Sequence, residues 1–367
     1  MQKKLFITGG HLTPSIAVID EIIHRKLPWE IVFIGRTHPF EGSDEISEER
    51  STVEVRHIRF ISITTGRLQR VFTFQSIISL AKVPFGFIQA IGLLIREKPD
   101  AIVSFGGYIA LPVVVSGYFF GIPIITHEQT RTPGVANKII SYFAQKICLS
   151  FPDTTHTFPR EKTVVTGLPI RKNALTVSKV IPLSFKLSLF PLIYITGGST
   201  GSVSLNDLVF PIISSLTRKY TVIHQVGKAS LTKATAVFGK LPVDDRKRYI
   251  VKDYIDESSV GWVLQNASLV VGRSGANTVT ELTLLHKKAV LIPLPWSGGA
   301  EQEENARWFT EHENGLILNQ RTASSEDLLS KISRMMSDRY TPKHANTPII
   351  PTEAAEQIVR FTQELLQ

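Results

Sequence analysis

Two stretches of the chain decide its fold: residues 4–11 read KLFITGGH, and residues 192–201 read LIYITGGSTG. In each, a short apolar strand runs into a pair of glycines. Similar strand–glycine units recur at residues 101–107 (AIVSFGG) and 268–275 (SLVVGRSG), and helical patterns separate them. Apolar strands that alternate with helices are typical of parallel sheets covered by helices on both faces. The sequence therefore predicts an α/β protein with two doubly wound domains.

The length of 367 residues also favours two domains over one. Polar residues and prolines interrupt the pattern between the halves, and the second half opens after Pro191. Thr352 is a candidate N-cap for a last helix, which we expect to pack back on the first domain. The expected divisions are a first domain at 1–172, a linker at 173–190, a second domain at 191–351 and a C-terminal helix at 352–367.

The composition narrows the class of protein and its partners. With 43% hydrophobic and 20% charged residues, the chain matches globular proteins and not disordered ones. A single cysteine, Cys148, excludes an intramolecular disulfide and any multi-cysteine metal site, and its apolar neighbours predict a buried thiol. The net charge of +9 leaves nucleic acid, anionic substrates or an anionic membrane surface as partners.

Two apolar stretches bear on membrane association. Residues 101–126 carry no charge, but glycines and prolines cut them into strand, loop, helix and strand, so we expect no membrane span there. Residues 71–95 have Lys82 as their only charge. Basic residues flank them, namely Arg67, Arg70, Arg96 and Lys98. Two readings stay open: a surface that dips into anionic headgroups, or a buried pair of helices broken at Pro84.

The glycine loops stand where a phosphorylated ligand would bind. In open parallel sheets, ligands lie beyond the carboxyl ends of the strands. Glycine there lets the backbone approach a ligand, and the next helix offers free N–H groups and a positive dipole end. The loops match neither the dinucleotide fingerprint nor the P-loop. Together they predict a phosphorylated ligand held between the two domains.

Seven motifs, taken in order along the chain, resemble those of a known family. They are TGGH (8–11), SFGGY (104–108), HEQ (127–129), TGLPIR (166–171), GGS (197–199), HQVGK (224–228) and RSGANTVTE (273–281). Together they resemble the MurG family, which belongs to glycosyltransferase family 28. The resemblance implies a GT-B fold, in which two Rossmann-like domains face a cleft. It also implies an inverting hexosyltransferase that moves N-acetylglucosamine from UDP-N-acetylglucosamine to the 4-hydroxyl of undecaprenyl-pyrophosphoryl-N-acetylmuramyl-pentapeptide in peptidoglycan synthesis.

The resemblance implies a donor site that lies mostly in the second domain. Ser199 would offer its hydroxyl and backbone N–H groups to the diphosphate. Glu281 would accept the ribose hydroxyls about 7.5 Å along a helix from Ala276. Ile255 would meet the uracil through its backbone, and Arg171 would place a positive charge near the nucleotide. The other implied donor contacts are Thr8, Gly9, Gly10, Thr130, Ala276, Asn277, Thr278, Val279, Thr280 and Gln302, the last one to the sugar.

The resemblance places the lipid-linked acceptor in the first domain. His11 would contact the acceptor and, with an ordinary pKa near 6.5, act as the base that takes the proton of the muramyl 4-hydroxyl. Glu128 would be the second catalytic residue, either by orienting an imidazole or by binding the acceptor, and Tyr108 would line the acceptor. No metal or cofactor is expected, because backbone amides, a helix dipole and Arg171 offset the charge of the departing UDP.

The chain also departs from the family pattern. Thr130 replaces an asparagine, Thr200 replaces a glutamine, and Phe6 and Ile7 replace glycines, changes that bear on substrate preference. Two alternatives stay open: a related GT-B transferase with another lipid acceptor, such as diacylglycerol, and a non-catalytic UDP-sugar-binding protein. Scattered basic residues argue against nucleic acid as a partner. We expect peripheral attachment to the cytoplasmic face of the cell membrane, through anionic lipids of the inner leaflet.

Overall fold

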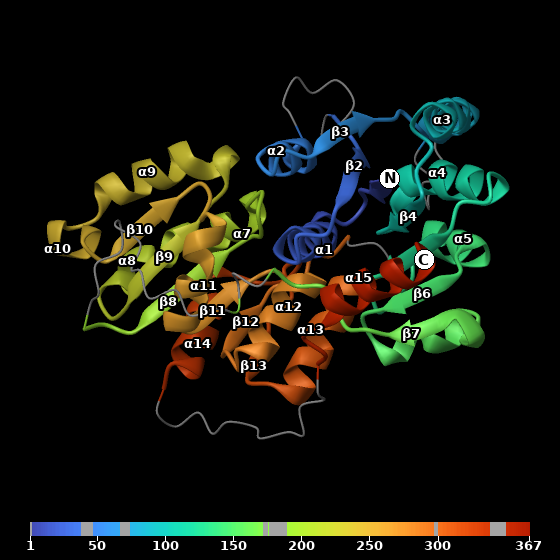
Figure 1. Cartoon of the computed structure of the whole chain (residues 1–367). Coiled ribbons are helices and arrows are strands. Elements are labelled where there is room, and N and C mark those ends of the chain that lie inside the picture. The colour runs from blue at the N-terminus through green and yellow to red at the C-terminus, as the bar shows by residue number, and fades with distance from the viewer. Residues whose placement is uncertain are drawn as a thin grey trace. The chain divides into compact units, whose positions relative to one another are not determined.

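A computed structural model of the chain describes residues 2–37, 47–66, 74–171, 175, 189–296, 300–337 and 350–367. They fall into two compact units, one of Met1–Arg171 with Pro351–Gln367 and one of Lys172–Ile350. Figure 1 shows the elements of both units along the chain. The expected linker at 173–190 lies outside the described residues, apart from 175, 189 and 190.

The first unit is built on a parallel sheet of seven strands in the order β3-β2-β1-β4-β5-β6-β7. The strands are β1 (Lys3–Thr8), β2 (Trp29–Gly35), β3 (Arg59–Ser62), β4 (Ala101–Ser104), β5 (Ile124–Glu128), β6 (Lys146–Leu149) and β7 (Thr163–Val165). In register, Leu5 of β1 pairs with Ile31 on one side and Ala101 on the other. The strand order reverses between β1 and β4, the switch point at which doubly wound sheets bind ligands.

Helices cover both faces of this sheet. Because successive residues of a strand point to opposite faces, each strand contributes side chains to two cores. Leu5 and Ile7 belong to the core on one face, and Phe6 belongs to the core on the other. The first face packs against α1 (Leu12–His24), α2 (Glu48–Glu54) and α15 (Ala354–Leu365), and the second against α3 (Phe74–Glu97), α4 (Gly107–Phe119) and α5 (Val135–Phe143). Two short 3-10 helices, η1 (Pro152–Thr157) and η2 (Arg160–Lys162), lie between β6 and β7. Cys148 is buried in β6 as expected, and burial raises the pKa of its thiol to about 12.

The C-terminal helix α15 packs on the first unit, as the sequence predicts. Ile358 and Val359 are buried in the same core as Ile16 and Ile19 of α1, and Figure 1 shows α15 in red beside α1 in blue. The proposed cap at Thr352 is wrong. The helix begins at Ala354, and the residue at the N-cap position makes no side-chain capping bond. The first helical residue, Ala354, is fully buried.

The two apolar stretches take different forms. Residues 101–126 form β4, α4 and β5, as predicted. Helix α3 runs without interruption through Pro84, so of the two open readings the one with a pair of helices broken at Pro84 is wrong. A proline removes one backbone N–H, and here the remaining helical hydrogen bonds carry the helix past it. Within the described ranges, no helix combines the length and apolar composition that crossing a bilayer requires. The flanking Arg67 and Arg70 lie outside the described residues.

The second unit repeats the same architecture with six parallel strands in the order β10-β9-β8-β11-β12-β13. The strands are β8 (Leu192–Thr196), β9 (Thr221–Gln225), β10 (Tyr249–Lys252), β11 (Ala267–Gly272), β12 (Ala289–Leu291) and β13 (Gly315–Ile317). One face packs against α7 (Val203–Val209), η3 (Phe210–Ile212), α8 (Ile213–Thr217) and α14 (Ser325–Met335), and the other against α11 (Glu257–Asn266), α12 (Ala276–Leu284) and α13 (Glu301–His312). Beside β10 lie α9 (Leu231–Lys240) and α10 (Val243–Arg246), and η4 (Lys228–Ser230) precedes α9. The two doubly wound sheets confirm the predicted fold class.

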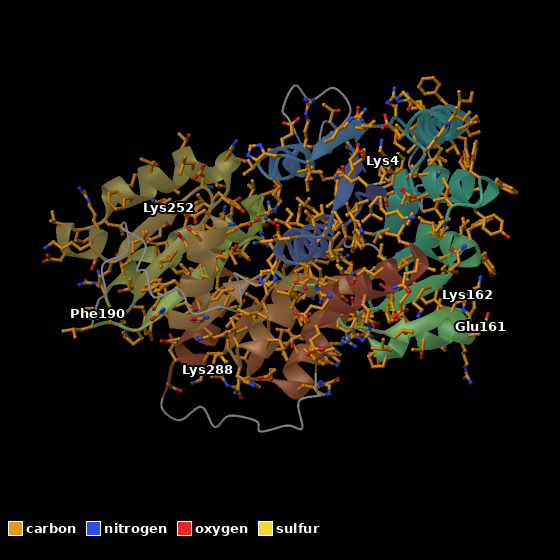
Figure 2. All side chains as sticks on the ribbon, in the orientation of Figure 1. Lys4, Glu161, Lys162, Phe190, Lys252 and Lys288 are labelled. Atoms are coloured by element: carbon orange, nitrogen blue, oxygen red, sulfur yellow. The ribbon has the colours of Figure 1, made fainter. Side chains whose placement is uncertain are left out.

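Glu97, the last residue of α3, forms ion pairs that connect α3 with β1 and β3 in the first unit. Its buried carboxylate binds Lys4 at 3.1 Å, Arg59 at 2.9 Å and Arg96 at 3.0 Å. Figure 2 labels Lys4, which lies on β1. Burial raises the pKa of Glu97, but the hydrogen bonds from the three cations outweigh burial and bring the pKa down to about 2. These ion pairs therefore stabilise the packing of α3 on the sheet.

Candidate active site

The carboxyl ends of the parallel strands carry most of the predicted site residues. In the first unit, the predicted residues are the last residues of β1 and β5, the turns after them, and the first turn of the helix after β4: Thr8, Gly9, Gly10, His11, Tyr108, Glu128 and Thr130. In the second unit, Ser199 lies in the turn after β8 and Ile255 in the turn after β10, and residues 276–281 start α12 directly after the turn that follows β11. Because the strands are parallel, each set shares one edge of its own sheet. The structure thus brings each set together within its own unit.

Several glycines of these turns allow one loop to pack against the next. A Cβ atom on Gly10 would lie 2.2 Å from the carbonyl oxygen of Gly106. In the second unit, a Cβ atom on Gly201 would lie 2.4 Å from the carbonyl oxygen of Val226. Both glycines also have positive φ angles, +141° and +76°, which side chains disfavour. Loop packing alone therefore accounts for these two glycines.

Gly198 and Gly275 are different, because a Cβ atom on either would meet nothing within 4 Å. Gly275 has a φ of −63°, which any residue adopts, so its backbone does not require glycine. It is the N-cap of α12, where it provides no side-chain cap, and the first turn contains no acidic residue. The first N–H groups of α12 thus lack a side-chain cap beside open space, an arrangement that suits a phosphate group.

Gln225, a buried residue at the end of β9, joins three segments of the second unit. Its Oε1 accepts hydrogen bonds from the Tyr194 hydroxyl at 3.1 Å and the Ile255 N–H at 3.2 Å, and its Nε2 donates to the Gly198 carbonyl at 2.8 Å. Because the Ile255 N–H is bonded in this way, the predicted backbone contact with uracil falls on the Ile255 carbonyl. Sequence reasoning gave Gln225 no role, although it belongs to one of the motifs.

Arg273 is a second residue that sequence reasoning left without a role. It is buried, and it donates to Ser202 Oγ at 2.6 Å, Ser204 Oγ at 2.8 Å and the Ile292 carbonyl at 2.9 Å. Burial lowers the pKa of its guanidinium to about 10, so the group stays charged at neutral pH. Among the residues that the structure describes, the hydrogen-bond partners of Arg273 are these neutral groups. Arg273 therefore adds an uncompensated positive charge beside the glycine loop that Ser202 ends.

The predicted sugar contact Gln302 lies next to the turn before α12. Ser274 Oγ donates to the Gln302 carbonyl at 2.7 Å, and the Leu294 N–H donates to Gln302 Oε1 at 3.0 Å. These bonds hold Gln302 against the residues that start α12. The predicted ribose contact Glu281 lies on α12, near Tyr194. Burial raises the pKa of the Tyr194 hydroxyl, and the Glu281 carboxylate adds to the rise.

In the first unit, His11 is the N-cap residue of α1 and is half-buried. Its Nδ1 atom lies 2.6 Å from Nε2 of Gln129. Burial lowers the pKa of the imidazole, while the charges of Glu128 and Glu49 act in the opposite direction. The pKa of His11 therefore lies below the ordinary histidine value. At neutral pH the ring is neutral, the state in which a histidine can accept a proton.

Glu128 ends β5, and its carboxylate is buried and held by its own loop. It accepts hydrogen bonds from the Thr130 N–H at 2.8 Å, the Thr130 hydroxyl at 2.7 Å, Asn137 Nδ2 at 2.9 Å and the Gly134 N–H at 3.3 Å. These four hydrogen bonds hold the carboxylate in one position. Thr130, implied as a donor contact, is buried here and bonded to Glu128.

Tyr108 lies in the first turn of α4 and contacts Arg36, which follows β2. Arg36 Nη1 donates to the Tyr108 hydroxyl at 3.3 Å, and the guanidinium carbon lies 5.7 Å from the ring centroid. The Arg36 N–H donates to the buried carboxylate of Glu49 at 3.0 Å, and a Cβ atom on Gly9 would lie 3.2 Å from that carboxylate. Arg36 and Glu49 therefore border the first glycine loop. They escaped prediction because neither lies in a recognisable motif.

Three predicted residues remain, Thr8, Arg171 and Ser199. Thr8 is fully buried at the end of β1, and among the described residues its hydroxyl has no hydrogen-bond partner. Arg171 is the last residue of the first unit's main segment and is half-buried, and Ser199 is exposed. Within the residues that the structure places, no three His, Cys, Asp or Glu side chains gather in a way that could hold a metal ion.

Both halves of the chain, and the chain as a whole, are similar to known proteins. The glycosyltransferase family 28 N-terminal domain matches residues 8–149, and the C-terminal domain of that family matches residues 192–360. The UDP-N-acetylglucosamine-N-acetylmuramyl-(pentapeptide) pyrophosphoryl-undecaprenol N-acetylglucosamine transferase of Clostridium kluyveri is 32% identical over 371 residues, which cover 99% of both chains. The protein of that name from Shouchella clausii is 31% identical over 374 residues, covering 100% of both chains.

The fold has a counterpart among solved structures. The crystal structure of MurG from Acinetobacter baumannii matches this chain with a TM-score of 0.66 at 23% sequence identity, over 99% of both chains. This likeness, together with the two doubly wound sheets, confirms the predicted GT-B fold class.

Proposed function

The chain belongs to glycosyltransferase family 28, and from this premise we propose that it moves N-acetylglucosamine from UDP-N-acetylglucosamine to the 4-hydroxyl of undecaprenyl-pyrophosphoryl-N-acetylmuramyl-pentapeptide. The observation that carries this proposal is the similarity, along 99% of both chains, to a transferase named for this reaction. The hydroxyl oxygen attacks C1 of the donor sugar, the bond from C1 to the phosphate oxygen breaks, and UDP leaves. Attack from the opposite side inverts C1 and gives a β-linkage.

The donor half of the reaction belongs to the second unit. The uncapped first turn of α12 and the open space at Gly198 and Gly275 support a diphosphate position there. Arg273 supports it further, since a buried cation with neutral partners stabilises a nearby anion. Glu281 then binds the ribose hydroxyls, and the Ile255 carbonyl accepts the N–H of the uracil ring. The N–H groups at the start of α12 and the Arg273 guanidinium bind more strongly as negative charge grows on the departing UDP.

The acceptor half belongs to the first unit, with His11 as the base. A neutral imidazole takes the proton of the 4-hydroxyl and becomes an imidazolium ion. Two buried carboxylates, Glu128 and Glu49, then stabilise that charge, because their fields raise the pKa of His11. Glu128 therefore acts on the base through its charge, and its own loop holds it in place. Tyr108, with Arg36 beside it, lines the acceptor position.

A turnover assay separates the three candidate functions. The protein is given UDP-N-acetylglucosamine with either the lipid-linked muramyl-pentapeptide or diacylglycerol, and release of UDP is measured together with formation of the disaccharide. We expect turnover with the muramyl acceptor only. Turnover with diacylglycerol instead would identify the related lipid transferase, and donor binding without any turnover would identify a UDP-sugar-binding protein.

His11 provides the matched test of mechanism. We expect His11→Ala to lower kcat at least a hundredfold, in line with the usual size of general base catalysis. The donor dissociation constant, measured by calorimetry, should stay within about threefold, because most of the proposed donor groups lie in the other unit. His24→Ala, on the same helix α1, is the control and should keep full activity.

We further propose that the exposed end of α3 and α4 rests on anionic lipid of the inner membrane leaflet, as a peripheral contact on the cytoplasmic face. Phe85, Ile88 and Ile95 follow one another at helical spacing on α3 and are 52%, 66% and 56% exposed. Helix α4 packs against α3 and ends in the exposed Phe119. Arg96, at the end of α3, adds an exposed positive charge. Apolar side chains framed by cations bind the interface of an anionic bilayer.

Vesicle sedimentation tests this contact. We expect the protein to pellet with phosphatidylglycerol vesicles and to remain in solution with phosphatidylcholine vesicles. The double variant Ile88→Glu with Ile95→Glu should lose most of the binding. Val55→Glu is the control, because Val55 is 77% exposed and follows α2, on the opposite face of the sheet. Equal pelleting of the double variant and the control would disprove this surface.

A further inference from the structure

Gln129 is the residue that contacts the ring of His11. It directly follows β5 and is 8% exposed. Its amide nitrogen lies 2.6 Å from His11 Nδ1. Its amide oxygen is buried and, within the described part of the chain, has no hydrogen-bond partner. A buried amide of which only one polar atom has a hydrogen-bond partner is rare in folded proteins and needs an explanation.

The amide orientation decides where the proton of the neutral ring lies. An amide nitrogen only donates hydrogen bonds, so the ring nitrogen that it faces must be an acceptor. Nδ1 of His11 therefore presents its lone pair to Gln129, and the single ring proton lies on Nε2. In this tautomer Nε2 is a donor, and it cannot take a proton from a hydroxyl group.

The other tautomer needs only a rotation of the same side chain. A half-turn of the planar amide about the Cγ–Cδ bond exchanges oxygen and nitrogen with almost no change in shape. The oxygen would then accept a hydrogen bond from Nδ1–H, and Nε2 would present the lone pair that a base requires. One proton moves from Nε2 to Nδ1 through solvent, so the ring remains neutral and no proton is gained or lost.

Other charged groups near the ring do not perform this function. Glu128 and Glu49 act on His11 through their charges, and His127 is the other imidazole close enough for a charge on His11 to affect it. Both oxygens of Glu128 accept hydrogen bonds from Thr130, Gly134 and Asn137. Among the described residues, Gln129 alone forms a hydrogen bond with the His11 ring.

We propose that Gln129 is a positioning residue that decides which nitrogen of His11 carries the proton, and that in the substrate-free protein the proton is on Nε2. This inference rests on the proposed function only for its consequence in catalysis: turnover requires the amide to present its oxygen to Nδ1. The resting orientation therefore holds the base in its unreactive tautomer.

Nitrogen NMR of the full-length protein with 15N-labelled histidine tests the proposal without turnover. The His11 signals are identified by their loss in His11→Gln. We expect the Nε2–H tautomer in the substrate-free protein and the Nδ1–H tautomer in Gln129→Glu, because a carboxylate only accepts hydrogen bonds. An Nδ1–H tautomer in the unsubstituted protein would overturn the proposal, and that result does not depend on the folding of Gln129→Glu.

The control and the kinetic measurement distinguish this proposal from the proposed function itself. Gln89→Glu adds the same charge to the same unit, and its side-chain oxygen can still accept the hydrogen bond from the Thr64 N–H. It should leave the His11 tautomer and the pH profile of kcat unchanged. Gln129→Glu should move the acidic limb of that profile up by about one pH unit or more, with the donor KM within about twofold. An Nε2–H tautomer that persists in folded Gln129→Glu would refute the positioning role, whether or not the protein turns over substrate.

Discussion

The substitution Gly275→Ala tests most directly whether the donor diphosphate lies at the start of α12. Gly275 is the N-cap of α12, with φ −63° and ψ 153°. Alanine adopts these angles without strain, and the added methyl group meets no protein atom within 4 Å. Any loss of function must then come from a ligand that occupies the space beside the glycine.

The structure gives opposite expectations for stability and binding. Replacing glycine with alanine at an unstrained position stabilises the folded state by about 0.4–1 kcal/mol, and the weaker N-cap preference of alanine offsets about as much. The free energy of unfolding should therefore change by less than about 0.5 kcal/mol. A methyl group that pushes the diphosphate away from one backbone N–H removes a charged hydrogen bond worth about 1.5–3 kcal/mol. This loss corresponds to a rise in donor KM of roughly tenfold to a hundredfold.

Steady-state kinetics with varied UDP-N-acetylglucosamine, together with urea unfolding, measure both quantities. The matched control is Gly134→Ala. Gly134 is the N-cap of α5 in the first unit, with φ −67° and ψ 151°, and its Cβ would also meet nothing within 4 Å. The control should leave the donor KM unchanged. If Gly275→Ala also keeps the donor KM within twofold while it folds normally, the diphosphate does not bind at this helix.

Three further predictions concern charge and burial. Arg273→Met should raise the donor KM at least tenfold and lower the free energy of unfolding by about 1–3 kcal/mol in urea, because Ser202, Ser204 and the Ile292 carbonyl lose their donor; unchanged donor affinity would place the diphosphate elsewhere. Glu97→Gln should lower the free energy of unfolding by about 1–2 kcal/mol at pH 7, after allowance for the partly exposed cations that bind Glu97. The pKa of Glu97 is lowered to about 2 in the folded protein, so the difference between variant and unsubstituted protein should vanish as the pH falls from 4.5 towards 2. His224 is buried and neutral, and burial lowers its pKa to about 3. Between pH 6.5 and 3 the unfolded chain binds a proton that the folded protein does not, so the free energy of unfolding should decrease by about 2–3 kcal/mol as the pH falls from 7 to 4.5. In thermal unfolding at a series of pH values, His224→Gln should show a smaller decrease.

The fold class and the place of the site follow from local patterns in the sequence. Apolar runs that end in glycines predicted β1, β4, β8 and β11, because a strand buried on both faces must be apolar throughout and the turn after it must be tight. The motifs around His11 and in residues 273–281 could be found for the same reason, since they directly follow those strands. The positions of these residues at strand ends depend only on chain order and parallel topology.

The sequence by itself therefore determined the two doubly wound sheets, the strand ends that carry the site, and the family. Tertiary structure alone decided what each of these residues touches. It distinguished the tightly packed Gly201 from the open Gly275 and buried Arg273 among neutral partners. It also lowered the pKa of His11 by burial and placed the ring against Gln129. Such properties depend on atoms brought within 3–4 Å from segments far apart in the chain, and no local pattern of residue types records that distance.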